Sequence, residues 1–224
     1  MKILRTFLIV SLLLLLPIWL SAQQMSHGTL TYSFEITQEQ ELPAEPRMLL
    51  IFDSNATRTE FGLPGLSETI TIYDGDAGRG LILVSAGGQS FAIPLTQEQF
   101  ESMDSASTIP EGVDIQLQGE SRDIAGLESS RYRVAQTGNE VEMSMWVARD
   151  VDLPASGFEQ QWGMGIDGLM TRLEVGDAEG STGLSIELQD IDRSEPADEL
   201  FDLAVPEGHT QLTFEQFMRM QGGV

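Results

Sequence analysis

The chain has 224 residues, with 35 acidic residues against 12 Lys and Arg, and it contains no Cys. Its formal net charge of −23 repels phosphate groups, which argues against nucleic acid as a partner and against electrostatic binding to an anionic membrane surface. Without a thiol the protein forms no disulfide, and no lipid anchor is attached through an N-terminal Cys.

The first 22 residues have the pattern of a secretory signal peptide. Lys2 and Arg5 precede an apolar run from Phe7 to Leu20, and Ser21-Ala22 provides small residues for cleavage before Gln23. The run is too short to favour a retained membrane anchor. We therefore expect a periplasmic or secreted protein.

Two parts follow from this reading: a signal peptide at residues 1–22 and a single β-rich domain at residues 23–224. The mature chain of about 200 residues is long enough for one substantial core, and no repeat or linker marks a second domain. Cleavage removes two basic residues, so the formal charge falls from −23 to −25 and no Lys remains. Such a surface is either simply solvated or adapted to high salt, which screens self-repulsion.

The mature chain begins with a clear strand pattern. From Gly28 to Thr37, the apolar residues Leu30, Tyr32, Phe34 and Ile36 alternate with polar ones, as in a half-buried antiparallel strand. Similar runs predict strands at residues 48–53, 57–61, 69–73, 81–84, 90–95, 113–118, 170–175 and 184–191. Within them, the side chains expected to face the core include Ile70, Ile72, Val113, Ile115 and Leu117.

Few helices are expected. Thr96 is the predicted N-cap of a helix over residues 96–103. A second short helix is predicted over residues 213–220, with Phe214, Phe217 and Met218 on one side. Between residues 156 and 169 four Gly interrupt the pattern, which favours a broken helix or an ordered loop.

A hairpin within residues 124–154 fixes the local register. Gly138-Asn139 favours a two-residue turn, because Gly adopts positive φ at no steric cost. Counting outward gives two faces. The face expected in the core pairs Val134 with Met143, Tyr132 with Met145 and Ser130 with Val147, and the face expected at the surface pairs Arg133 with Ser144 and Arg131 with Trp146.

Residues that support catalysis or metal binding are scarce. His27 and His209 are the two His of the chain, and each is expected to be exposed and inert, which argues against a Ser–His–Asp triad. The pairs Asp150/Asp152 and Asp190/Asp192 are more typical of a solvated strand edge than of a calcium site. No nucleophile elbow, phosphate-binding Gly loop or dinucleotide fingerprint occurs. We expect no enzymatic activity, no metal and no cofactor.

About ten or eleven short strands with few helices predict a mainly β fold built on a curved antiparallel sheet. Five segments occur in a characteristic order: Gly28–Tyr32, Ile124–Gly126, Tyr132–Val134, Trp146–Asp150 and Phe201–Gly208. Their order resembles an uncharacterised family of secreted bacterial proteins, domain of unknown function 4412.

This resemblance implies a half-barrel like that of the periplasmic lipoprotein carriers, in which a curved sheet wraps over short helices and the concave face holds lipid. Members of the family often carry a Cys shortly after the Ile-x-Gly turn. Ser129 and Ser130 occupy that stretch here, so a role for the thiol is absent. The family has no assigned activity.

The second half of the chain is rich in Met and aromatic residues. Met is common on surfaces that accept varied apolar ligands, so one interpretation is a cleft and the other is a core filled by Met and Trp. The candidate ligand-binding residues are Tyr132, Met143, Met145, Phe158, Trp162, Met164 and Met170.

Together these patterns predict an exported, non-enzymatic binding protein that holds a lipid or another apolar ligand in the concave sheet face. The alternative is an envelope structural or protein-interaction module with a filled core and no ligand. The expected partners are accordingly an apolar ligand or an envelope protein.

Overall fold

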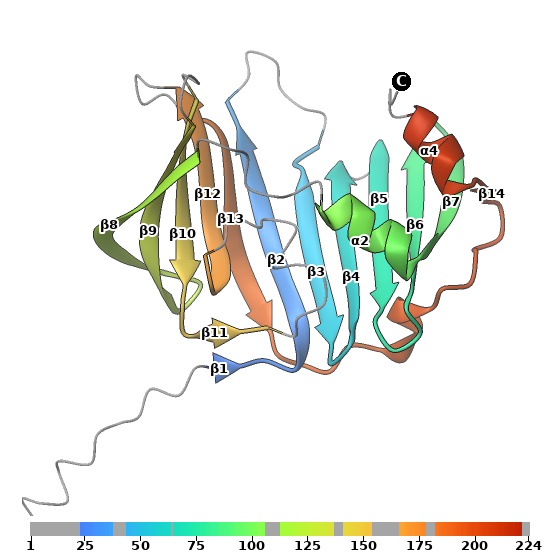
Figure 1. Cartoon of the computed structure of the whole chain (residues 1–224), viewed down its shortest axis with the longest axis horizontal. Helices are drawn as coiled ribbons and strands as arrows, with labels where there is room; N and C mark the ends of the chain where they lie inside the picture. Colours follow the sequence, from blue (N-terminus) through green and yellow to red (C-terminus); the bar gives the residue numbers. More distant parts are fainter. Residues whose placement is uncertain are drawn as a thin grey trace, which may run out of the picture.

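The computed structural model describes residues 23–37, 44–63, 65–105, 113–136, 141–153, 166–177 and 182–220. Most of them form one open sheet of 12 strands in the order β14-β7-β6-β5-β4-β3-β2-β13-β12-β10-β9-β8 (Figure 1). The bounds of these strands are β2 His27–Ile36, β3 Arg47–Asp53, β4 Ala56–Leu63, β5 Ser67–Asp74, β6 Arg79–Ala86, β7 Gln89–Thr96, β8 Val113–Ile124, β9 Leu127–Gln136, β10 Val141–Ala148, β12 Leu169–Asp177, β13 Thr182–Asp192 and β14 Thr210–Gln211.

Three smaller elements and one strand pair complete the described fold. The helices are α2 (Gln97–Ser105) and α4 (Phe214–Met220), and η1 (Asp198–Phe201) is one turn of 3₁₀-helix. The strands β1 (Gln23–Gln24) and β11 (Val151–Asp152) pair in parallel outside the main sheet. The prediction of a mainly β fold with a curved antiparallel half-barrel sheet and few short helices is confirmed. The predicted signal peptide lies outside the described residues.

Local hairpins build the sheet. Strands β2 to β7 form one antiparallel meander, β8 to β10 form another, and β13 joins them by pairing with both β12 and β2. The turn between β8 and β9 contains Ala125 at φ 51° and Gly126 at φ 80°, the positive values that a tight hairpin turn requires. Among the described strands of the main sheet, β14 and β7 are the one pair that runs parallel.

The register predicted for the hairpin of β9 and β10 is confirmed. Met143 pairs with Val134, Met145 with Tyr132 and Val147 with Ser130. The predicted turn at Gly138-Asn139 lies outside the described residues. The Arg131 guanidinium lies 5.9 Å from the centre of the Trp146 ring, as expected for a cation–π contact.

The surface position expected for Trp146 is wrong, since the residue is only 8% exposed. Trp146 belongs to the main apolar cluster together with Ile124 and Leu127 from the turn between β8 and β9. Arg131 donates from Nη2 to Ser144 Oγ at 2.9 Å, which holds the guanidinium near the indole. The face of the β9–β10 hairpin that the sequence pattern predicts to be polar therefore buries its one aromatic residue, Trp146.

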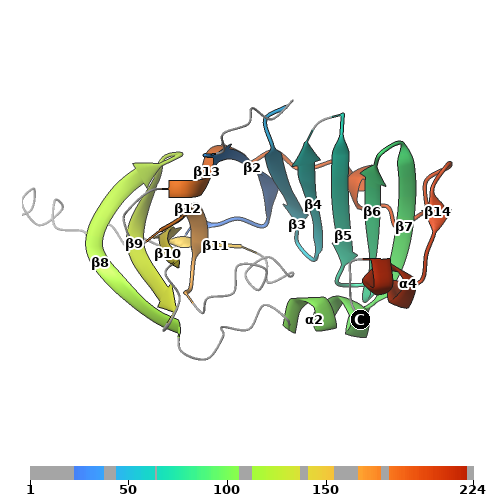
Figure 2. The ribbon, with the colours of Figure 1, turned by 90° about the horizontal axis from the view of Figure 1, so that it is seen from above.

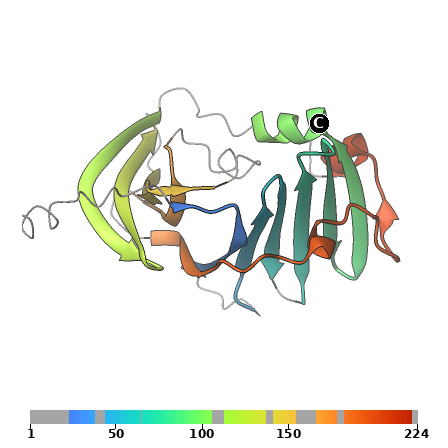
Figure 3. The ribbon, with the colours of Figure 1, turned by 90° about the horizontal axis from the view of Figure 1, so that it is seen from below.

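The sheet curves so that its concave face carries α2 and α4, while the chain from η1 to β14 runs along the opposite, convex face (Figures 2 and 3). On the concave side, Ile82, Ile93 and Leu95 pack with Phe217 of α4 and Phe100 of α2. On the convex side, Leu81, Leu83 and Ala92 pack with Leu203 from the segment after η1. The sheet around β6 and β7 is thus apolar on both faces.

Both helices have reciprocal caps. Thr96 Oγ1 accepts from the Gln99 amide at 3.3 Å, and Gln99 Oε1 accepts from the Thr96 amide at 3.0 Å. Thr213 and Gln216 repeat this arrangement at α4. Phe214 and Phe217 join the apolar cluster as predicted. Met218 was expected beside them but is 44% exposed, because it lies past the side of this short helix that meets the sheet.

Ile72 is buried and Ile70 is half-buried, so both point inward as predicted. The strand register puts them on the convex face. They are covered on that side because the chain from η1 onward crosses it. Leu117 was expected in the core and is 56% exposed, since β8 is the last strand of the sheet.

Candidate ligand-binding face

Two apolar rows cross the concave face of the sheet from β8 to β2. The strand register defines an inner row of Leu117, Tyr132, Met145, Leu173, Ile186 and Phe34. Two residues further along each strand, toward the end of β2 at Ile36, the same strands define a second row. This outer row consists of Ile115, Val134, Met143, Val175, Leu184 and Ile36. Every member of both rows is apolar or aromatic, so six strands present one continuous apolar surface.

The two rows differ in exposure. In the inner row, Tyr132, Met145 and Leu173 are buried and pack in the main cluster. In the outer row, Val134 is buried, whereas Met143 and Leu184 are half-buried and Ile36 is 38% exposed. Partly exposed apolar surface thus occurs along the outer row and at Leu117, the β8 end of the inner row. An exposed apolar strip of this kind is a common feature of interaction or ligand sites.

The candidate site residues separate accordingly. Tyr132, Met145 and Met170 are 8%, 3% and 5% exposed, which places them inside the core. Met143 is the one candidate among the described residues that reaches the partly exposed row. A role of these residues in ligand binding stays a prediction. Phe158, Trp162 and Met164 lie outside the described residues.

Tyr32 anchors the core beneath the rows. It is fully buried in β2, and its hydroxyl donates to the Met170 carbonyl oxygen at 2.9 Å, which links β2 to β12 across β13. Burial raises the pKa of the Tyr32 phenol far above its ordinary value, so the group stays neutral and donates its proton. Its chemistry is structural, since a phenol that resists ionisation is no base.

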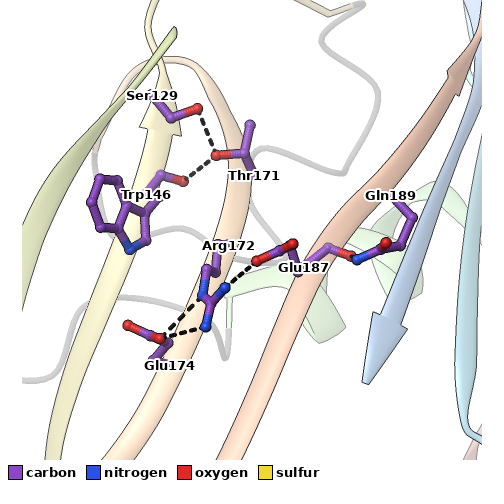
Figure 4. Close-up of polar contacts among 7 residues, drawn as sticks. All are labelled: Ser129, Trp146, Thr171, Arg172, Glu174, Glu187 and Gln189. Carbon is purple, nitrogen blue, oxygen red and sulfur yellow. Dashed lines mark hydrogen bonds and ion pairs between the residues drawn. The ribbon is translucent and has the colours of Figure 1, made fainter. Parts of the chain in front are cut away.

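The opposite face of the same strands carries a polar network (Figure 4). Arg172 of β12 pairs with Glu174 on its own strand at 2.6 Å and with Glu187 of β13. Desolvation lowers the pKa of Arg172, but the hydrogen bonds and charges of the two carboxylates outweigh it and raise the pKa overall. The guanidinium therefore stays charged and joins the two strands.

A buried hydroxyl pair lies beside this network (Figure 4). Thr171 and Ser129 are both fully buried, and Thr171 Oγ1 donates to Ser129 Oγ at 2.8 Å. Ser129 in turn donates to the Leu127 carbonyl oxygen at 3.2 Å. Ser129, which follows the turn between β8 and β9, is therefore a buried residue whose hydroxyl is satisfied by hydrogen bonds.

Sequence reasoning missed a groove at the ends of β4 to β7. It has a volume of about 450 Å³ and is lined by Arg47, Glu60, Phe61, Gly62, Gly65, Leu66, Ser67, Glu68, Ser85, Ala86, Gly88, Gln89 and Ser90. Phe61 and Leu66 are 47% and 51% exposed. The sequence signal for this groove is the pair of apolar residues Phe61 and Leu66 at a hairpin end. The pattern of residues 62–65 between them predicts only a turn.

Metal-binding and catalytic arrangements were sought in the described part of the chain. No group of three or more His, Asp or Glu that could hold a metal ion occurs among those residues. His27 Nδ1 lies 3.2 Å from Oγ of the adjacent Ser26. His209 Nδ1 is buried without a hydrogen-bond partner in the described structure. Both His27 and His209 are half-buried rather than exposed as expected. No described helix is long and apolar enough to span a membrane.

Comparison with known proteins adds information about the fold. No family model matches the sequence. No curated protein sequence matches it either. The resemblance to domain of unknown function 4412 therefore stays a prediction.

Several solved structures are similar at low sequence identity. PNGF-II has a TM-score of 0.51 at 11% identity over 87% of this chain, which spans only 33% of PNGF-II. An uncharacterised conserved protein from Thermus thermophilus has a TM-score of 0.50 at 12% identity, covering 84% of this chain and 90% of the other. The Mycobacterium tuberculosis lipoprotein LppX has a TM-score of 0.38 at 14% identity, covering 76% and 88%, a likeness too low to carry an inference. The first two likenesses show a shared fold and nothing about activity.

Proposed function

We propose that this chain is an exported, non-catalytic binding protein that holds a lipid or another apolar ligand against the outer row of the concave face. The observation that carries the proposal is the unbroken apolar outer row, whose members Met143, Val175 and Leu184 are only half-buried where they pack beside the main cluster. An acyl chain is long, flexible and apolar, so it matches a strip that crosses six strands without a polar residue.

The electrostatics of the molecule suit a neutral or cationic ligand better than an anionic one. The formal net charge is −23, and the described outer row offers no cation of its own to a phosphate or carboxylate. Anionic ligands would meet general repulsion, whereas neutral lipids would not. Periplasmic or extracellular location, proposed on the N-terminal pattern, would give the protein access to such lipids.

The second candidate is an envelope structural or protein-interaction module without a ligand. The burial of Tyr132, Met145 and Met170 favours it, because three of the candidate ligand residues are already packed by the protein. The two candidates differ in one measurable property, the occupancy of the outer row by a small apolar molecule.

Two measurements on protein purified from a bacterial periplasm distinguish the candidates. Native mass spectrometry followed by organic extraction detects co-purified lipid, and a dansylated undecanoic acid together with a neutral dansylated monoacylglycerol reports apolar binding by fluorescence. We expect saturable binding with preference for the neutral probe. Absence of both co-purified lipid and saturable probe binding would reject the ligand-binding function in favour of the ligand-free module.

A matched pair of variants locates the site. Met143→Glu places a charge in the outer row, and Met218→Glu places one on exposed α4, away from that row. We expect Met143→Glu to weaken probe binding at least tenfold and Met218→Glu to leave it unchanged. Met143→Trp serves as a second, uncharged variant that fills the row, and thermal melts verify that all three proteins fold. Equal effects of both Glu variants would place the binding elsewhere.

A further inference from the structure

The two ends of the sheet differ in how their backbone groups are covered. At one end β14 pairs with β7, through Thr210 with Phe91 and Gln211 with Ala92. At the other end β8 pairs with β9 alone within the described residues. The outward amide and carbonyl groups of β8 therefore have no strand partner in that part of the chain, and such an edge is a template for strand addition.

The apolar rows of the concave face end at this edge. Leu117 closes the inner row and is 56% exposed, and Ile115 closes the outer row and is half-buried. Leu117 lies in the same row as the buried residues Tyr132 and Met145. One more strand beside β8 would therefore bury the exposed side chain of Leu117. A strand laid beside β8 would continue both rows with its own side chains, because alternate residues of paired strands share a face.

A bulge limits the length of the edge. The pairing of β8 with β9 shifts register between Leu117 and Ser121, and Gly119 within this interval has φ 71°. Bulges bend a strand and interrupt a straight edge. The segment open to regular pairing therefore runs from Val113 to Leu117 and suits a partner segment of about five residues.

The charges of the edge select its partner. On the face opposite Ile115 and Leu117, β8 presents Asp114 and Gln116, and Gln116 Nε2 donates to Asp114 Oδ2 at 2.6 Å. The chain as a whole carries a formal charge of −23. A second copy of the chain would bring the same large negative charge to the contact, whereas a basic segment is attracted to it.

We propose that the β8 edge, from Val113 to Leu117, binds an extended basic segment of a partner protein by strand addition. The segment alternates apolar residues, which continue the rows at Ile115 and Leu117, with Lys or Arg residues, which face Asp114. Main-chain hydrogen bonds supply the affinity and the alternation supplies the specificity. This interaction is separate from ligand binding at the outer row.

The experiment uses the full-length mature protein and a fluorescein-labelled, acetylated peptide of alternating Val and Lys. The control peptides replace every Lys with Glu, or the central Val with Pro, which removes a main-chain donor and disfavours a strand. Fluorescence anisotropy at low and high salt measures binding, and amide hydrogen exchange measures protection. We expect saturable binding of the Lys peptide alone, weakened by salt, with new protection confined to the amides of residues 113–117.

Matched variants test the position. Leu117→Lys puts a charge at the edge, and Leu66→Lys puts one at the turn between β4 and β5, where Leu66 is 51% exposed. We expect Leu117→Lys to weaken peptide binding at least tenfold and Leu66→Lys to change it less than twofold. Leu117→Ser, which adds no charge, should weaken binding about threefold in a protein with an unchanged melting temperature.

Three results would overturn the proposal. The first is no saturable binding of the Lys peptide, and the second is an equal loss with the Leu66 and Leu117 variants. The third is a dimer in native mass spectrometry that Leu117→Lys abolishes while the peptide fails to bind, because it would make a second copy the occupant of the edge.

Discussion

The two halves of the sheet, around β6 and β7 and from β8 to β13, differ in how their apolar faces are covered. Around β6 and β7, described elements cover both faces: α2 and α4 on the concave side and the segment after η1 on the convex side. From β8 to β13, the convex face carries charged and hydroxyl networks, and the outer row of the concave face is half-buried at Met143, Val175 and Leu184. The comparison shows that one half has both faces of the sheet covered, whereas the other half keeps partly buried apolar residues on its concave face.

The largest expected effect comes from the residue at the junction of the halves. Tyr32→Ala removes a fully buried ring and the hydrogen bond to the Met170 carbonyl, so we expect a loss of about 3–5 kcal/mol in the free energy of unfolding. Urea denaturation followed by circular dichroism measures it. Because β2 pairs with both β13 and β3, protection from hydrogen exchange should fall in both halves together. A loss confined to one half would show that the junction does not couple them.

Tyr32 also predicts a dependence on alkaline pH. Its folded-state pKa is raised by burial above the ordinary value of about 10, so the unfolded chain releases this proton first as pH rises. The stability associated with Tyr32 is complete below about pH 10 and declines above it. We expect Tyr32→Phe to lose stability less steeply between pH 10 and 11 than the parent protein, in urea titrations at each pH. Parallel profiles would contradict this assignment.

A smaller loss of stability is expected when Phe217 of α4 is truncated, and it should affect only the half around β6 and β7. Phe217 of α4 is 9% exposed and packs on Ile82, Ile93 and Leu95. Phe217→Ala should cost about 3 kcal/mol, at the lower end of the range for such truncations, since the helix is peripheral. We expect the amides of β6 and β7 to exchange faster while those of β10 and β12 keep their protection. Faster exchange of all four strands would mean that the halves open as one unit.

The smallest effect comes from the helix caps. Thr213→Ala removes the hydroxyl that accepts from the Gln216 amide, at an expected cost of about 1 kcal/mol. Thr96→Ala makes the same change at α2. We expect α4, which has 7 residues, to be more sensitive than α2, which has 9, and thermal melts together with helical circular dichroism measure the difference. The reverse order would show that packing rather than capping holds α4.

Much of the architecture was predictable because it depends on local rules. Alternation located β2, and the count outward from the Gly-Asn turn gave the pairing of Tyr132 with Met145. The described residues form fourteen strands, whereas the sequence predicts ten or eleven. The difference lies in β1, β11 and β14, which have two residues each. Such short bridges leave no periodic signal, because two residues contain no repeat.

The wrong predictions of side-chain burial share one physical cause. Whether a face is buried depends on segments that are distant in the sequence. Leu117 is exposed because β8 has no strand on its outer side in the described fold, and Trp146 is buried because the turn between β8 and β9 and Arg131 close around it. Alternation shows which residues share a face, but it does not show what lies against that face.

The short parallel pairing of β14 with β7 has a consequence for solubility. A sheet with two open edges can add identical copies at both ends and grow without limit, as fibres do. Here the chain returns and β14 pairs with β7 at Phe91 and Ala92, which covers this part of the β7 edge. A strand added at β8 therefore has no equivalent place at Phe91 and Ala92, so the described sheet does not offer two like edges from which a fibre could grow.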